Sequence, residues 1–302
     1  MNKIFWQEKL QEKYKDIKAA VDEPMSKHSS FRAGGKADLL VEPLNKEQVK
    51  YVLRFAGEHG IPLTVLGNCS NVLVKDNGIR GIVMKISRMD KIHVDGNIVT
   101  CEAGALLSSL AGAALENSLA GMEFAAGIPG SVGGGVYMNA GAYDGELKDV
   151  IMAVKSLSLS GEECEWASDR LEFGYRQSVF SQNSHIITEA VFNLSVGDKA
   201  VIREKMLDYA ERRRSKQPLE LPSAGSTFKR PQGHFAGKLI QDAGLCGLMI
   251  GGAQVSEKHA GFIVNKENAT ASDILHLIEE VQKRVYENSG VKLYPEVRII
   301  GE

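Results

Sequence analysis

A glycine-rich segment, Gly127–Tyr143, is the part of the chain whose composition most directly indicates chemistry. It reads GIPGSVGGGVYMNAGAY and holds six glycines and one proline among small apolar residues. Glycine permits positive φ and the close approach of a ligand, and several glycines together can turn successive backbone N–H groups toward an anion. A flexible linker would be richer in serine, lysine and glutamate. The composition favours a buried loop against a large ligand, and a hinge or a closely packed turn is the alternative.

The usual nucleotide-binding and metal-binding motifs are absent from the sequence. The chain has no G-x-G-x-x-G, and GHFAGKL, residues 233–239, lacks the length and the hydroxyl group of a P-loop. Its seven histidines show no metal-ligand spacing, so we predict no metal site. Its four cysteines form no C-x-x-C pair, which favours reduced thiols over a disulfide framework or a zinc site. Any bound dinucleotide must be held in another way.

Five motifs in order resemble one family of flavoproteins. VLGNCSNVLV, residues 65–74, is similar to the pyrophosphate loop of the FAD-binding fold of vanillyl-alcohol-oxidase-type (PCMH-type) flavoproteins, and the glycine-rich segment is similar to a second flavin-contacting segment. FGYRQS, AGSTFKRP and YPEVRIIG, residues 173–178, 224–231 and 294–301, point to the UDP-N-acetylenolpyruvoylglucosamine reductase family. The short gap between FGYRQS and AGSTFKRP resembles its short-loop subtype. The resemblance covers nearly the whole chain, from about residue 28 to residue 302.

This resemblance implies the reduction of an enol ether double bond in the synthesis of peptidoglycan precursors. In the family, NADPH reduces FAD, whose N5 then donates hydride to C3 of UDP-N-acetylglucosamine enolpyruvate, and protonation of C2 gives UDP-N-acetylmuramate. Charge that develops at C2 spreads onto the carboxylate, so the reaction needs a cation there and a proton donor at C2. We expect non-covalent FAD, because GNCSN lacks the histidine to which related flavoenzymes often attach the flavin.

Three residues match the catalytic positions of the family. Arg176 matches the residue that binds the carboxylate, Ser226 matches the proton donor, and Glu296 matches an acid that stabilises the enol or orients the serine. Without the resemblance, each has an ordinary explanation: a surface arginine on a turn, a serine that bonds its own backbone, and a strand-edge glutamate paired with Arg298.

The resemblance also assigns residues that bind FAD and the substrate. The expected FAD-binding residues are Leu66, Gly67, Asn68, Cys69, Ser70, Asn71, Gly127, Ile128, Pro129, Gly130, Ser131, Gly133, Gly134, Met138, Asn139, Gly141 and Ala142. The expected substrate-binding residues are Tyr175, Lys216, Lys229 and Arg230. Lys216 lies in the basic run RRRSKQP, whose alternative explanation is a solvated helix C-terminus. Cys69 and Arg230 depart from the family, which often has glycine and asparagine there.

Two other functions fit parts of the pattern. An FAD-dependent oxidase of the same fold would need a base instead of a proton donor, which Arg176, Ser226 and Glu296 argue against. A non-catalytic nucleotide-sugar-binding protein would need no flavin loop, so the purified protein would be colourless instead of yellow.

The elements that must position these residues alternate between helices and strands. We expect a charged helix over residues 2–22, a strand over 37–42, a helix that begins at Asn45 and ends at Gly60, and strands over 61–66 and 72–74 around the GNCSN turn. Short strands follow, with hairpin turns at DGN and SGE and one helix over 106–118. Helices over 200–214 and after Thr270 precede a final strand.

The expected fold class is α+β, with a two-subdomain PCMH-type FAD-binding region and a C-terminal α/β substrate-binding domain. Its boundaries are an N-terminal helix over 1–22, FAD-binding subdomains over 23–85 and 86–198, and the substrate-binding domain over 199–302. The composition of the 302 residues, 43% hydrophobic and 25% charged, is ordinary for globular domains.

Charge and hydropathy exclude two classes of partner. The net charge of −2, without a long run of one sign, gives no basic surface for nucleic acid. The charged start of the sequence and the absence of a membrane-spanning apolar run indicate a cytoplasmic protein with no membrane insertion. The sequence does not indicate an oligomeric state.

Overall fold

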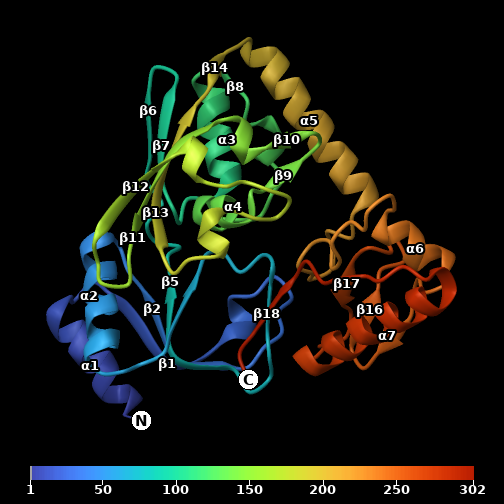
Figure 1. Ribbon diagram of the computed structural model, residues 1–302, viewed down its shortest axis with the longest axis horizontal. Coiled ribbons are helices and arrows are strands. Elements are labelled where there is room, and N and C mark those ends of the chain that lie inside the picture. The colour runs from blue at the N-terminus through green and yellow to red at the C-terminus, as the bar shows by residue number, and fades with distance from the viewer. Residues whose placement is uncertain (1) are drawn as a thin grey trace. The chain divides into compact units, whose positions relative to one another are not determined.

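The computed structural model describes residues 2–302, which form two compact units (Figure 1). Unit 1 comprises residues 2–21, Leu39–Asn68 and Gly81–Arg213, and unit 2 comprises Asp22–Asp38, Cys69–Arg80 and Arg214–Glu302. Each unit has its own apolar core: that of unit 1 includes Trp6, Val52 and Phe192, and that of unit 2 includes Phe31, Leu73 and Val281. The chain therefore contributes several separate segments to each unit, and the division into four consecutive domains stays a prediction.

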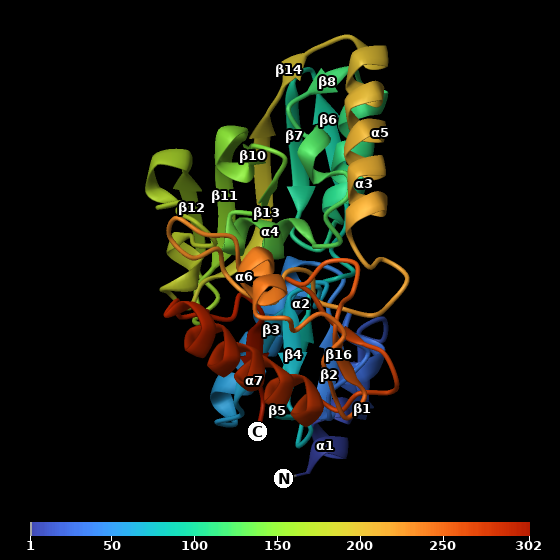
Figure 2. The same ribbon diagram turned by 90° about the vertical axis from the view of Figure 1, so that its right-hand side faces the viewer.

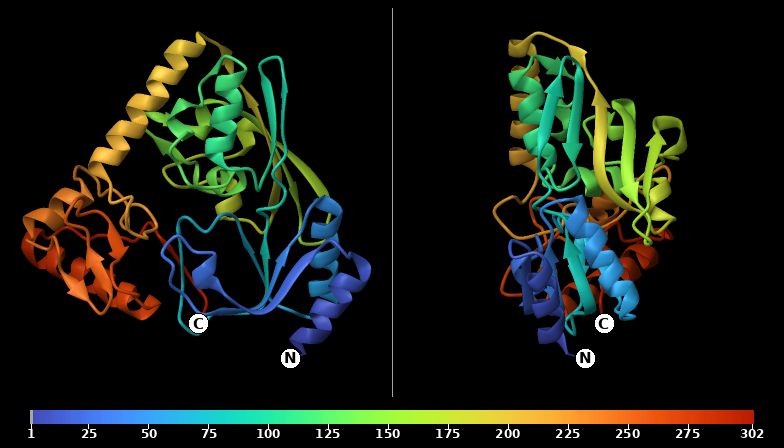
Figure 3. Two further views of the ribbon diagram at one scale, coloured as in Figure 1. Left: turned by 180° about the vertical axis from the view of Figure 1, so that it is seen from behind. Right: turned by 90° about the vertical axis from the view of Figure 1, so that its left-hand side faces the viewer.

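A four-stranded sheet, most of whose residues belong to unit 1, has the order β1-β2-β5-β3. Its strands are β1 (Lys18–Pro24), β2 (Lys36–Glu42), β5 (Ile79–Lys85) and β3 (Leu63–Leu66). Helix α2 (Lys46–Glu58) begins as predicted at Asn45, whose side chain accepts a hydrogen bond from the Gln48 N–H. The buried face of α2, which includes Val49 and Val52, joins the core of unit 1 beside these strands (Figure 3).

The N-terminal helix is shorter than predicted. Helix α1 spans Lys3–Lys13, and β1 takes the place of the rest of the predicted helix. Tyr14 adopts an extended conformation at the C-cap, and the Ala19 carbonyl accepts a hydrogen bond from the Gln7 side chain. Pairing within the sheet therefore outweighs the helix propensity of KAAVDE.

A five-stranded antiparallel sheet in unit 1 has the order β12-β11-β13-β7-β6. Its strands are β6 (Ile92–Asp95), β7 (Ile98–Glu102), β11 (Ile151–Leu157), β12 (Glu163–Ala167) and β13 (Ile186–Asn193). The predicted hairpins are confirmed, since DGN joins β6 to β7 and SGE joins β11 to β12. Helices α3 (Leu107–Glu116) and α5 (Lys199–Lys216) lie on the side of β6 and β7 (Figure 2).

The remaining elements of unit 1 are short. The strand pairs are β8 (Leu119–Ala120) with β14 (Ser195–Val196) and β9 (Gly141–Ala142) with β10 (Gly145–Glu146), and α4 spans Val132–Met138. Short 3₁₀ helices across the chain span Met25–Lys27, Glu123–Ala125, Leu147–Asp149, Ser168–Arg170 and Val179–Ser181.

Unit 2 contains a three-stranded antiparallel sheet and two helices. The strands are β15 (Met249–Ile250), β16 (Ala253–Val255) and β17 (Ile263–Asn265), and the helices are α6 (Ala236–Asp242) and α7 (Ala271–Ser289). Helix α7 begins with the predicted capping box of Thr270 and Asp273. The last strand, β18 (Arg298–Ile300), pairs in parallel with β4 (Val72–Val74). Within residues 2–302, no helix has the length and apolar character that a bilayer crossing requires.

Candidate active site

The glycine-rich segment includes a helix where a loop was expected. Ser131 is the N-cap of α4 and its Oγ accepts a hydrogen bond from the Gly134 N–H at 3.4 Å. Val132 and Val136 are fully buried in the core of unit 1, and α4 ends at Asn139, which has a φ of 43°. The N-cap and the packing of these valines therefore outweigh the low helix propensity of glycine.

The glycines of α4 differ in their surroundings. A Cβ atom on Gly133 would lie 2.9 Å from Ala103 Cβ, and one on Gly135 would lie 3.0 Å from Leu107 Cδ1, so protein packing excludes side chains there. A Cβ atom on Gly134 would meet only the hydroxyl of the N-cap serine, at 3.3 Å. Gly134 thus leaves open space along the helix, which fits the approach of a cofactor.

The GNCSN turn reaches the glycine-rich segment within unit 1. Ser131 Oγ occupies the position that a Cβ atom on Gly67 would need. The Asn68 side-chain amide donates a hydrogen bond to the Pro129 carbonyl at 2.6 Å. Two of the motifs that predict FAD binding, which are far apart in sequence, therefore lie together.

Cys69 and Asn71, from the same turn, belong to unit 2. Cys69 has a φ of 52°, a conformation that favours glycine, which agrees with the frequent glycine of the family at this position. Its side chain is buried. The Asn71 side-chain amide donates to the Glu296 carbonyl at 3.1 Å, so it holds the backbone of a predicted catalytic residue.

Arg176 lies at the tip of a tight turn in unit 1. Gly174 and Gln177 exchange two backbone hydrogen bonds, of 3.0 and 3.3 Å, around Tyr175 and Arg176. Arg176 has a φ of 56°, which costs a non-glycine residue about 1–3 kcal/mol and persists only when the surroundings hold it. The Arg176 guanidinium also lies 5.2 Å from the centroid of the Tyr175 ring.

The C-terminal end of α4 holds this turn. Asn139 is almost fully buried, and its amide donates to the Gly174 carbonyl at 3.1 Å and to Glu146 Oε2 at 2.8 Å. The side-chain Oδ1 of Asn139 accepts a hydrogen bond from the Lys148 backbone N–H at 3.1 Å. The side chain of Asn139, an expected FAD-binding residue, is therefore engaged within the protein and positions the turn of Arg176.

Glu146 lies near the predicted catalytic residue Arg176, and the motifs did not reveal it. Its hydrogen bond with the Lys148 side chain is the main reason why its pKa lies below the usual value; the Asn139 amide and the charge of Arg176 act in the same direction, against the effect of burial. Its carboxylate therefore stays ionised near the Arg176 turn. The only sequence signal is its place in GAYDGE, directly after the glycine-rich segment.

The segments that carry Ser226 and Glu296 lie side by side in unit 2. The Thr227 carbonyl accepts from the Glu296 N–H, and the Tyr294 carbonyl accepts from the Lys229 N–H, both at 2.8 Å. The segments AGSTFKRP and YPEVRIIG thus run antiparallel. Thr227 is the backbone partner of Glu296, and Ser226 directly precedes Thr227. Ser226 is exposed and Glu296 is half-buried.

His259 supports the segment of Ser226 on the side opposite Glu296, through Gly261. The Gly261 carbonyl accepts from the Thr227 N–H at 2.8 Å, and the Gly261 N–H donates to His259 Nδ1 at 3.1 Å. Burial lowers the pKa of His259. Burial therefore disfavours the protonated imidazole, and Nδ1 acts as a hydrogen-bond acceptor.

The expected substrate-binding cations of unit 2 are exposed: Lys216, Lys229 and Arg230. The Arg230 guanidinium lies 4.1 Å from the centroid of the Phe235 ring, and Phe235 is 62% exposed. This contact restricts the orientation of the guanidinium. Phe235 was not predicted, since a single aromatic residue in GHFAGKL gives no signal of this contact.

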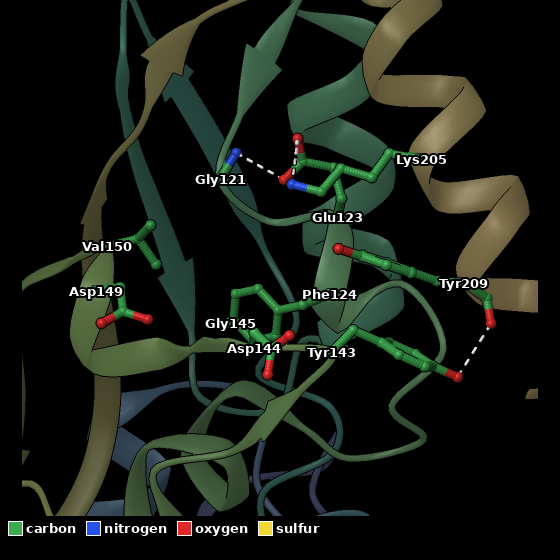
Figure 4. Close-up of a pocket in the computed structure, with 10 residues that line it drawn as sticks. All are labelled: Gly121, Glu123, Phe124, Tyr143, Asp144, Gly145, Asp149, Val150, Lys205 and Tyr209. Atoms are coloured by element: carbon green, nitrogen blue, oxygen red, sulfur yellow. Dashed lines mark hydrogen bonds and ion pairs between the residues drawn. The ribbon is translucent and has the colours of Figure 1, made fainter. Parts of the chain in front are cut away.

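A cavity of about 420 Å³ lies in unit 1 beside the β9–β10 hairpin (Figure 4). Its lining residues are Gly121, Glu123, Phe124, Tyr143, Asp144, Gly145, Asp149, Val150, Lys205 and Tyr209. None of the predicted catalytic or binding residues is among them. Residues 2–302 also contain no grouping of three or more His, Cys, Asp or Glu side chains that could hold a metal ion.

The fold and the cofactor-binding region define an FAD-dependent oxidoreductase. Residues 37–166 match the family model of an FAD-binding domain, and residues 217–300 match that of the UDP-N-acetylenolpyruvoylglucosamine reductase C-terminal domain. The predicted fold class, α+β with a PCMH-type FAD-binding region, is confirmed.

The chain belongs to the UDP-N-acetylenolpyruvoylglucosamine reductase family. It is 54% identical over 295 residues to the reductase of Clostridium perfringens strain SM101, covering 97% of this chain and 96% of that relative. The reductase of Geobacillus kaustophilus is 55% identical over 281 residues, with 93% and 92% coverage. The crystal structure of the reductase from Thermus caldophilus matches with a TM-score of 0.81 and 32% identity, over 94% of this chain and 99% of that one.

Proposed function

We propose that the protein catalyses the NADPH-dependent reduction of UDP-N-acetylglucosamine enolpyruvate to UDP-N-acetylmuramate, a step of peptidoglycan precursor synthesis. The observation that carries this proposal is the 54% identity over 97% of the chain to a reductase of this name. FAD, when bound, supplies the hydride that it has received from NADPH. The oxidase and the non-catalytic binding protein are not favoured by these relationships.

In this proposal, Arg176 binds the carboxylate of the enolpyruvyl group. Its planar guanidinium suits a carboxylate, and it stabilises the charge that spreads there as hydride reaches C3. The rigid turn supports this role, because a pre-positioned cation needs little reorganisation during the reaction. Tyr175, at the same turn, restricts the guanidinium through the contact of its ring.

Ser226 donates the proton to C2 in this proposal. Serine is a weak acid, so the reaction relies on its exact placement next to a strongly basic carbon. The backbone hydrogen bonds of Thr227 with Gly261 and with Glu296 fix the segment on both sides, which supports such placement. Glu296 then orients the serine hydroxyl or stabilises the enol, consistent with its place on the neighbouring segment.

We assign the diphosphate of the substrate to Lys216, Lys229 and Arg230. The three cations are exposed, and the six residues Lys229–His234 contain no acidic side chain to compete for them. The Phe235 ring lies against the Arg230 guanidinium, whose planar charge suits phosphate oxygens.

The residues around the GNCSN turn and α4 fit non-covalent FAD. The open space at Gly134 and the contacts of Gly67 and Asn68 with the glycine-rich segment support this assignment. Both NADPH and a UDP-sugar are intracellular metabolites, so we place the reaction in the cytoplasm.

A direct test mixes the purified protein with NADPH and the enolpyruvyl UDP-sugar and follows the oxidation of NADPH. We expect a yellow protein that oxidises NADPH rapidly only when the sugar nucleotide is present, with UDP-N-acetylmuramate as the product. A colourless protein, or NADPH oxidation that does not depend on the sugar nucleotide, would contradict the proposal.

A further inference from the structure

The turn that carries Arg176 is attached to the C-terminal end of α4 at both of its own ends. At the first end, the Gly174 carbonyl accepts a hydrogen bond from the Asn139 amide at 3.1 Å. At the other end, the fully buried Ser178 donates from its Oγ to the Tyr137 carbonyl at 2.9 Å. The position of Arg176 therefore depends on how the Asn139 side chain is held.

The Glu146 carboxylate decides which way the Asn139 amide faces. Glu146 Oε2 accepts from Asn139 Nδ2 at 2.8 Å, and an ionised carboxylate can only accept hydrogen bonds. The NH₂ group must therefore face Glu146, and Nδ2 also donates to the Gly174 carbonyl. The opposite orientation would place Oδ1 against these two acceptor oxygens and the NH₂ group against the Lys148 N–H, which now donates to Oδ1. The carboxylate thus keeps the first end of the turn attached.

The Glu146 side chain is itself held by its neighbours. Its Oε2 pairs with Lys148 Nζ at 2.9 Å, its carboxylate accepts from the Asp149 N–H, and its own N–H donates to Asp149 Oδ2 at 2.9 Å. Glu146 lies opposite Gly141 in the β9–β10 pair, where a Cβ atom on Gly141 would lie 2.7 Å from Glu146 Cγ. Gly141, one of the expected FAD-binding residues, therefore leaves room for this side chain.

Glu146 and Arg176 also attract each other through their charges. The hydrogen bond with Lys148 is the main cause of the lowered pKa of Glu146, and the charge of Arg176 contributes to it. An anionic group near the guanidinium favours one position of Arg176 before the substrate arrives. A cation that is already in position needs little reorganisation when the carboxylate binds and the charge on it grows.

We propose that Glu146 is a positioning residue for the reduction: through the Asn139 amide, it fixes the turn from which Arg176 meets the carboxylate of the substrate. This inference rests on the proposed function. Since Glu146 acts through Arg176, its replacement should impair the recognition and turnover of a carboxylate and leave the flavin unaffected. A purely structural role in α4 would instead lower the flavin content.

The first test compares Glu146→Ala and Glu146→Gln with the FAD-loaded wild type. In Glu146→Ala we expect kcat/KM for the enolpyruvyl UDP-sugar to fall about tenfold with a raised KM, the effect of losing one charged hydrogen bond. Flavin content and the rate of FAD reduction by NADPH should stay at wild-type values. Glu146→Gln keeps an acceptor oxygen but loses the charge, so it should recover only part of the activity. Glu116→Gln is the matched control, because Glu116 pairs with Lys199 at 2.7 Å on the exposed end of α3.

A double-mutant cycle tests whether Glu146 acts through Arg176. In the Arg176→Ala background, Glu146→Ala should change kcat/KM by less than about twofold, because the group that it positions is already gone. Effects of the two substitutions that multiply would overturn the proposal. Loss of flavin from Glu146→Ala would also overturn it, since that result assigns Glu146 to the cofactor site.

A binding measurement supplies a readout that does not need turnover. Calorimetry compares the affinities for UDP-N-acetylmuramate, which carries a carboxylate, and UDP-N-acetylglucosamine, which does not. We expect the wild type to prefer the first nucleotide and Glu146→Ala to lose about tenfold of this preference. An unchanged preference in Glu146→Ala, or no preference in the wild type, overturns the inference.

Two further outcomes are also decisive. If Glu146→Ala does not fold, Glu146→Gln decides, and wild-type preference and turnover in that variant count against the inference. A wild-type protein that prefers the carboxylate but does not reduce the enolpyruvyl UDP-sugar contradicts the proposed function alone, and the preference of the Glu146 variants still tests the positioning role.

Discussion

Ser226 acquires its proposed role from its backbone surroundings. The side chain is an alcohol on an exposed loop, and such serines usually bond their own backbone. The two hydrogen bonds of Thr227 fix the neighbouring backbone, and Glu296 lies on the adjacent segment. A weak acid can then act because its position is fixed.

Replacing Ser226 with alanine should separate the two halves of the reaction. We expect NADPH to reduce FAD at nearly the wild-type rate, while turnover of the enolpyruvyl substrate falls about 10²–10⁴-fold, the usual contribution of a general acid. Stopped-flow absorbance measures the first step and steady-state kinetics the second. Ser223→Ala, in the same loop, is the control, and full turnover by Ser226→Ala would remove the acid assignment.

The proposed role of Arg176 also depends on a single side chain. Binding of the carboxylate uses both the charge and the planar pair of N–H groups of the guanidinium. Arg176→Ala should lower kcat/KM roughly tenfold to a hundredfold, the value of a charged hydrogen bond, and should raise KM for the sugar nucleotide. Arg176→Lys should recover little, because an ammonium cannot bind a carboxylate in the bidentate way. Steady-state rates would be compared with those of Arg170→Ala, an exposed arginine in the same region. Wild-type kinetics in Arg176→Ala would refute the role.

Helix α4 combines packing with cofactor access. Its first turn begins at Ser131, two of its glycines are packed against neighbouring side chains, and Gly134 faces open space. Its C-terminal residue Asn139 holds the Arg176 turn. One short helix therefore connects the predicted cofactor site with a predicted catalytic residue.

Gly134→Leu tests the open face of α4. The new side chain would fill the space that the cofactor needs, so we expect purified protein with far less flavin and a melting temperature close to that of flavin-free wild type. Absorbance of the flavin per protein measures the content. Gly112→Leu is the matched control, because Gly112 also lies in a helix and a Cβ atom there would meet nothing within 4 Å. Undiminished yellow colour in Gly134→Leu would count against this location of FAD.

The stability of the whole molecule should depend on pH through His259. Burial holds the pKa of His259 below its ordinary value of 6.5 in the folded protein. As pH falls below about 6.5, the unfolded chain takes up this proton before the folded one does, so the free energy of unfolding decreases until the folded pKa is passed. Above that range, the contribution is fully present.

His259→Gln should reduce this pH dependence. Urea unfolding at several pH values between 7.5 and 5 would show a smaller loss of stability in His259→Gln than in the wild type, because the titrating group is gone. His93→Gln, on an exposed strand position, should retain the wild-type slope. Equal slopes in His259→Gln and the wild type would contradict the assignment.

The sequence by itself determined those features that short-range signals encode. Asn45 and Gln48 begin α2, Thr270 and Asp273 begin α7, and two glycine-bearing turns make the hairpins, because caps and turns depend on a few neighbouring residues. The order of five motifs was also enough to identify the family, since each motif has its own residue types and spacing.

Only the tertiary structure decided the features that rest on distant contacts. β1 replaces the end of a predicted helix because it pairs within a sheet, and α4 is helical because its valines pack into a core. Asn139 is engaged by Gly174 and Glu146, and Arg213 reaches Gly127, although no local pattern relates these positions. The physical reason is the same in each case: the stabilising partner lies elsewhere in the chain, and only folding brings the two together.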